Sequence, residues 1–179
     1  MKVKLTVKRI TILIISLILL VLIVYKLSYK PITKINYFGR IFEFRDDIKL
    51  AKKVRAIPDE KTIHNLFWNE SLKRITIVFK PIESQTGYYA VEAFELSNKL
   101  SLMYLLNGRK IGFESENVTS YENITSNQNE LKIILIHPLL TNKTLIEAKD
   151  NLVFVFARNE RDFDLATIKL ILIAMGVKV

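Results

Sequence analysis

The pattern of apolar and polar positions divides the chain into one continuous apolar stretch and a longer region of alternating segments. Residues 10–25 are almost wholly apolar, and residues 1–30 carry basic but no acidic side chains. Extended to Tyr29, a helix here approaches the roughly 30 Å of a bilayer's hydrocarbon core. Tyr25 and Tyr29 stand where interfacial aromatic side chains are common. The pattern predicts a transmembrane anchor with basic flanks over residues 1–30, followed by a single domain over residues 31–179.

Two alternatives to an anchor stay open. A cleaved signal peptide has a shorter apolar core and a cleavage site made of small residues, and residues 26–31 offer no such site. A helix buried in a soluble domain would not need cations at both of its ends. An uncleaved anchor, with the lipid bilayer as its first partner, therefore explains the stretch best.

Charge and four short motifs predict the orientation of this anchor. Basic residues are denser before the stretch than after it, which favours a cytoplasmic amino terminus. N-glycosylation acceptor motifs occur downstream at four positions: Asn69, Asn117, Asn123 and Asn142. Together these features predict that residues 31–179 lie outside the cytoplasm. Asn117 and Asn123 are expected to be modified first, because they occupy the most polar segment of the chain.

The region after the anchor begins with short elements and then a clear strand, helix and strand. Residues 35–45 alternate around Gly39 and predict a hairpin, and short helices are expected over residues 46–53 and after Pro58. A β-branched strand (74–80), a helix (87–106) and a strand (109–114) then form a predicted βαβ unit. Glu92, Glu95, Asn98 and Lys99 are expected to form the polar face of this helix. Phe94 is expected on its apolar side.

The last third of the chain predicts a second group of elements around a buried strand. A polar loop (115–130) precedes the nearly continuous apolar run 131–136, typical of a strand covered on both faces. A hairpin (144–148 with 152–157) and a very apolar helix (163–175) follow. In this helix four residues are expected to pack on the sheet rather than line a ligand cavity: Leu165, Ile168, Leu172 and Met175. The predicted fold class is α/β (or α+β), with a mixed sheet and a buried carboxyl-terminal helix.

Three segments carry a resemblance to other proteins. Residues 42–47, 93–96 and 164–172 resemble segments of archaeal proteins that have a single membrane anchor and no assigned activity. The resemblance implies a single-pass membrane protein. It implies no catalytic residues and no cofactor.

Composition removes several classes of function. Six of the 27 basic residues lie in residues 1–30, so the remainder carries 21 basic against 18 acidic residues, well mixed along the chain. Nucleic-acid binding needs clustered cations, so no nucleic-acid partner is expected. The chain has no cysteine, which excludes disulfides, thiolate metal sites and cysteine nucleophiles.

Candidate chemistry is sparse. In an open α/β sheet, ligands gather beyond the carboxyl ends of parallel strands, where Lys80, His137 and Arg158 are candidates to hold an anion or a carboxylate. The alternative is that these residues belong to ordinary polar loops at the ends of strands. His64 is expected to be a surface residue or one with a structural partner. No metal-ligand spacing, phosphate-binding loop or nucleophile motif is present, so no metal, cofactor or catalytic residue is predicted.

Two functions of different classes remain. The first is a membrane-anchored extracytoplasmic binding or structural domain within a cell-envelope complex, with a protein partner. The second is an anchored enzyme that uses the carboxyl edge of the sheet near His137, and a carboxylate within hydrogen-bond reach of this histidine would favour it.

Overall fold

The computed structural model describes residues 33–82 and 86–177, and the predicted anchor lies outside the described residues. Within these ranges, no helix is both long enough and apolar enough to cross a bilayer. The elements in chain order are β1 (Thr33–Tyr37), β2 (Arg40–Phe44), α2 (Ile48–Ala51), β3 (Arg55–Ile57), α3 (Glu60–Phe67), β4 (Arg74–Phe79), α4 (Thr86–Leu106), β5 (Gly112–Asn117), β6 (Glu130–Ile136), a 3-10 turn (Pro138–Leu140), β7 (Leu145–Lys149), β8 (Leu152–Phe156) and α5 (Glu160–Met175).

The domain is built on a mixed six-stranded sheet, as predicted. The strand order is β3-β7-β8-β6-β4-β5, and a separate two-stranded sheet holds β1 and β2. β8, β6, β4 and β5 are mutually parallel, whereas β7 runs antiparallel to β8 and β3 runs parallel to β7. The βαβ unit β4-α4-β5, the hairpin of β1 and β2 and the hairpin of β7 and β8 are confirmed.

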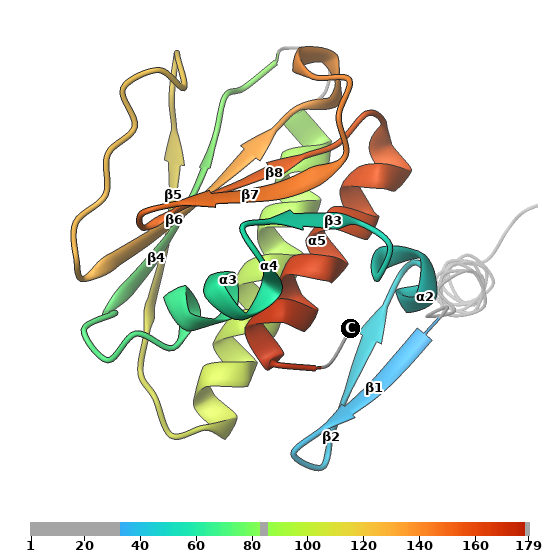
Figure 1. Cartoon of the computed structure of the whole chain (residues 1–179), viewed down its shortest axis with the longest axis vertical. Coiled ribbons are helices and arrows are strands. Elements are labelled where there is room, and N and C mark those ends of the chain that lie inside the picture. The colour runs from blue at the N-terminus through green and yellow to red at the C-terminus, as the bar shows by residue number, and fades with distance from the viewer. Residues whose placement is uncertain (1–32, 83–85, 178–179) are drawn as a thin grey trace, which may run out of the picture.

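The helices gather on one side of this sheet (Figure 1). α5 contacts α2, α3 and α4 as well as β7 and β8, so it is the centre of the helical layer. All four of its predicted core residues, Leu165, Ile168, Leu172 and Met175, are buried, although Leu165 and Ile168 also line cavities beside the helix, contrary to the expectation. At its carboxyl end, Gly176 (φ 66°) permits the left-handed turn in which Val177 N–H donates to the Leu172 carbonyl. The helix is therefore packed around most of its circumference.

α3 packs beside the carboxyl end of α5 and is hydrogen-bonded to it. His64 Nδ1 lies 2.8 Å from the Ile173 carbonyl oxygen, and Trp68 Nε1 donates to the Ala174 carbonyl at 2.8 Å. The Trp68 bond gives a partner to a carbonyl at the end of the helix, and the Ile173 carbonyl, which also accepts from Gly176 N–H, gains a second one. His64 therefore has a structural partner, as expected.

Four details differ from the sequence-based expectation. β3 was not predicted, because three residues are too short to show alternation. β5 begins at Gly112 rather than at Arg109, and α5 begins at Glu160. α4 is rotated relative to its expected faces: Glu92 and Lys99 are buried, whereas Phe94 is 63% exposed. The rotation follows from packing, because α5 and β2 both cover the side of α4 that carries the two charged residues.

Candidate functional site

The carboxyl ends of β4 and β6 bring two predicted site residues into one neighbourhood. The Lys80 backbone N–H donates to Tyr121 Oη at 3.0 Å, and Tyr121 Oη donates to the Leu135 carbonyl at 2.9 Å. Tyr89 of α4 stacks on Phe79 and lies 5.3 Å, centroid to centroid, from the His137 ring. Lys80 and His137 therefore flank a cluster of aromatic rings.

The geometry of His137 gives it a structural role. Its side chain is 1% exposed, and its Nδ1 accepts a hydrogen bond from Leu139 N–H at 3.1 Å, which starts the 3-10 turn. Burial lowers the pKa of His137, while the charge of Glu160 acts in the opposite direction. Among the described residues no carboxylate is hydrogen-bonded to this imidazole. The arrangement thus lacks the histidine–carboxylate pair that would favour general-base chemistry.

Arg158 belongs to a different neighbourhood from the other two predicted ligands. Its Nε donates to Asp162 Oδ2 at 2.8 Å and to Thr144 Oγ1 at 3.2 Å. The cavity that it lines includes neither Lys80 nor His137.

The second face of the sheet is the largest feature that sequence reasoning missed. Six apolar residues from β4, β6 and β8 share this side and pack with no described helix: Val78, Ile134, Ile136, Leu152, Phe154 and Phe156. We call this surface the open face. A single segment lies over part of it, through Val118, Tyr121 and Ile124. Val78, Ile134 and Ile136 are buried, whereas the three residues that β8 contributes to this face, Leu152, Phe154 and Phe156, are only half-buried. The rings of Phe154 and Phe156 stack at 6.1 Å.

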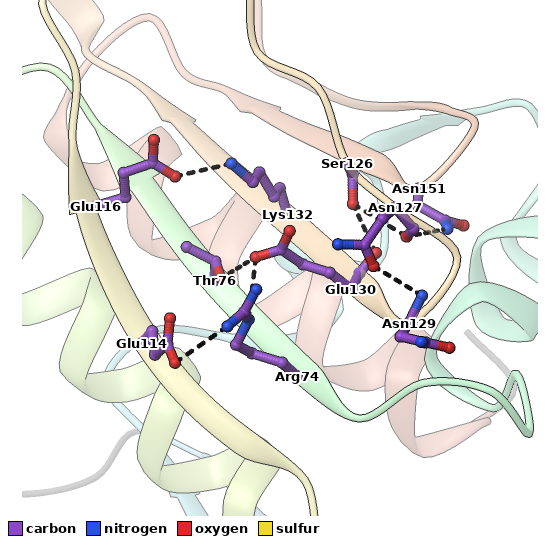
Figure 2. Close-up of polar contacts among 10 residues, drawn as sticks. All are labelled: Arg74, Thr76, Glu114, Glu116, Ser126, Asn127, Asn129, Glu130, Lys132 and Asn151. Atoms are coloured by element: carbon purple, nitrogen blue, oxygen red, sulfur yellow. Dashed lines mark hydrogen bonds and ion pairs between the residues drawn. The ribbon is translucent and has the colours of Figure 1, made fainter.

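Charged side chains fill the other half of the open face, on β4, β5 and β6 (Figure 2). Arg74 Nε donates to Glu130 Oε1 at 3.2 Å, and the same oxygen accepts from Thr76 Oγ1 at 2.6 Å. Arg74 also pairs with Glu114 at 3.4 Å. Lys132 Nζ pairs with Glu116 at 2.8 Å. These ion pairs across neighbouring strands, two basic side chains against three acidic ones, form a polar border beside the apolar residues.

Asparagine side chains fix the part of this border that lies at the start of β6. Asn151 Nδ2 donates to the Asn127 carbonyl at 2.9 Å, and Asn129 N–H donates to Asn127 Oδ1 at the same distance. Ser126 Oγ donates to the Glu130 carbonyl at 2.6 Å (Figure 2). The loop before β6 is thereby tied to the hairpin of β7 and β8, which fixes the border relative to the apolar half.

A buried polar cluster lies between α4, α5 and the end of β2. Glu92 shares a small cavity of about 10 Å³ with Arg45, Glu95 and Asp164, a volume close to that of one water molecule. Burial raises the pKa of Glu92 to about 8, and the adjacent carboxyl group of Asp164 acts in the same direction. A protonated Glu92 can donate a hydrogen bond to Asp164, which removes the repulsion between two carboxylates.

The four predicted glycosylation sites all lie on the surface. Asn69, Asn117, Asn123 and Asn142 are exposed. Asn117 and Asn123 border one open cavity of about 480 Å³, together with Glu116 and Lys132. Asn69 Oδ1 instead accepts hydrogen bonds from the backbone and hydroxyl of Ser71, within its own acceptor motif.

Comparison of the chain with family models, curated proteins and solved structures finds no match. Within residues 33–82 and 86–177, no group of three or more His, Asp and Glu side chains is placed to hold a metal ion. The open face is the surface on which partly exposed aromatic side chains lie beside a border of charged ones.

Proposed function

We propose that this chain is a membrane-anchored domain that binds a protein partner outside the cytoplasm, as part of a cell-envelope complex. The observation that carries the proposal is the open face. A sheet of mainly parallel strands usually has both faces covered, and here one face keeps half-buried phenylalanines over which residues 33–82 and 86–177 place no helix.

The composition of the open face supports a protein as its partner. Stable protein interfaces combine an apolar centre, enriched in aromatic residues, with a polar rim. The centre is supplied by Leu152, Phe154 and Phe156. One rim is the border of paired charges on β4, β5 and β6, and the other contains Glu147 and Lys149 on β7, which lie opposite Phe154 and Leu152. A partner with an apolar centre of its own would bury these rings while leaving the paired charges in water.

The sequence around the start of the domain supports its attachment to a membrane. β1 begins at Thr33, a few residues after the apolar stretch of residues 10–25. Such a short connection would hold the domain next to the bilayer. A partner anchored in the same membrane would then be confined to the same surface, which raises its effective concentration.

The proposed location makes a first prediction. Protease added to intact cells that produce the chain is expected to digest the domain over residues 31–179 and to leave a short membrane-bound fragment containing residues 1–30. The fragment is followed with an antibody against the amino terminus. Lysed cells treated in the same way serve as the control for accessibility. A domain that resists protease in intact cells and is digested after lysis would place it in the cytoplasm. Loss of the fragment would favour a cleaved signal peptide.

A further inference from the structure

A cationic cavity lies on the far side of the domain from the border of paired charges. It has a volume of about 500 Å³ and is formed where the end of α2, the segment before β7 and the first turns of α5 meet. Three basic residues line it, Lys53, Arg158 and Arg161, against a single acidic one, Asp162. We propose that this cavity is a binding site for a phosphate group or a similar divalent oxyanion.

Both arginines are held in place by carboxylates that occupy only part of each guanidinium. Arg158 is fixed through Nε to Asp162, whose Oδ2 also accepts from Thr144 Oγ1 at 2.6 Å. Within the described residues the two terminal nitrogens of Arg158 form no hydrogen bond. Because a guanidinium has five donors in a planar fork, an arginine held by Nε keeps its outer edge for an oxyanion.

Arg161 is oriented in a similar way. Its Nε donates to Asp46 Oδ2 at 2.9 Å, and one terminal nitrogen lies 3.4 Å from Asp46 Oδ1. The side chains of Arg158 and Arg161 remain 61% and 64% exposed, so both can be reached from solvent. Two preoriented guanidinium groups lower the entropic cost of binding an anion between them.

The charges around the cavity favour an anion. The lining residues carry an excess of two positive charges, and one remains after Asp46, which pairs with Arg161 from outside the lining, is counted. Lys53 is exposed and adds an ammonium group at the mouth. Leu50, Val54 and Leu165 supply an apolar wall. The ligand class is therefore a phosphate carried on a molecule with an apolar portion.

Titration calorimetry with inorganic phosphate tests the site. The full chain in detergent micelles is titrated at constant ionic strength, with chloride as the reference anion. We expect saturable binding at one site, weakened at least about tenfold by Lys53→Gln or by Arg158→Lys, since each removes or distorts a charge-assisted contact to the anion. Lys61→Gln removes the same charge from an exposed position on α3 and should leave the affinity unchanged.

Two results would overturn the proposal. One is the absence of saturable binding in the unmodified chain. The other is an equal affinity in all four proteins, which would mean an adventitious ion only. The site is independent of the proposed partner on the open face, so either result leaves that proposal standing.

Discussion

Replacing Leu172 by alanine is expected to lower the free energy of unfolding by about 2–5 kcal/mol, a large part of the stability of a domain of this size. Leu172 is fully buried in α5, the helix that contacts every other helix of the domain as well as the sheet. Removal of its side chain leaves a cavity that neighbours on several elements cannot all close. Leu172→Asp would bury an unpaired carboxylate and should prevent folding altogether.

Chemical denaturation of the full chain in detergent micelles measures this effect. Leu105→Ala is the matched control, because Leu105 is a helical leucine that is 69% exposed, and its replacement should change stability by less than about 0.5 kcal/mol. If α5 were covered only by an oligomer or by the bilayer, Leu172→Ala would resemble Leu105→Ala and would merely reduce self-association.

The contribution of Glu92 to the stability of the domain is expected to fall by about 1.5 kcal/mol as the pH rises from 6.5 to 8. Burial raises its pKa from 4.5 to about 8 in the folded state. In this pH range the unfolded chain has released the proton and the folded chain retains it. Folding must therefore take up a proton, and this becomes harder as the pH rises.

The variant Glu92→Gln isolates this contribution, because the amide has nearly the same shape and cannot ionise. The difference in unfolding free energy between the variant and the unmodified chain should grow with pH in favour of the variant. Two other buried groups titrate near the ends of this range. His137, whose pKa burial lowers, acts mainly below about 6.5. Burial lowers the pKa of Lys99 to about 8, so this lysine begins to release its proton within the range and acts on stability in the opposite direction to Glu92. Glu70→Gln, at an exposed position, is the control, and an identical pH slope in all three proteins would contradict the role of Glu92.

Local patterns were sufficient to predict most of the elements. The apolar run that became β6 predicted burial on both faces, and it is covered by the helices on one side and by Val118, Tyr121 and Ile124 on the other. Of the three residues expected at the carboxyl edge of the sheet, Lys80 and His137 share an aromatic neighbourhood, whereas Arg158 lines a separate cavity. The successful inferences are those that periodicity and chain order determine directly.

Features that depend on pairing between distant strands could not be predicted. Polar residues alternate at positions 74 and 76, 114 and 116, and 130 and 132. Which of them lie side by side depends on the register between β4, β5 and β6, and the sequence does not show this register. Arg158 follows β8, the strand next to β6, but its side chain is bound by Asp162 of α5 and lines a cavity that does not include His137. Glu92 was expected on a solvated face, and its burial depends on α5, more than sixty residues later in the chain.

The absence of cysteine makes one measurement of the proposed function direct. Phe156→Cys places a single thiol on the open face, and Phe94→Cys places one on the exposed side of α4 in the helical layer. A membrane-impermeant maleimide is applied to intact cells that produce either full-length variant, and each labelling rate is divided by that of the purified protein.

The proposal predicts that Cys at position 94 is labelled in intact cells as readily as in the purified chain, whereas Cys at position 156 is protected in cells by the bound partner. Equal labelling at the two positions in intact cells would mean that no partner covers the open face. Labelling at neither position before lysis, and at both afterwards, would contradict the extracytoplasmic location.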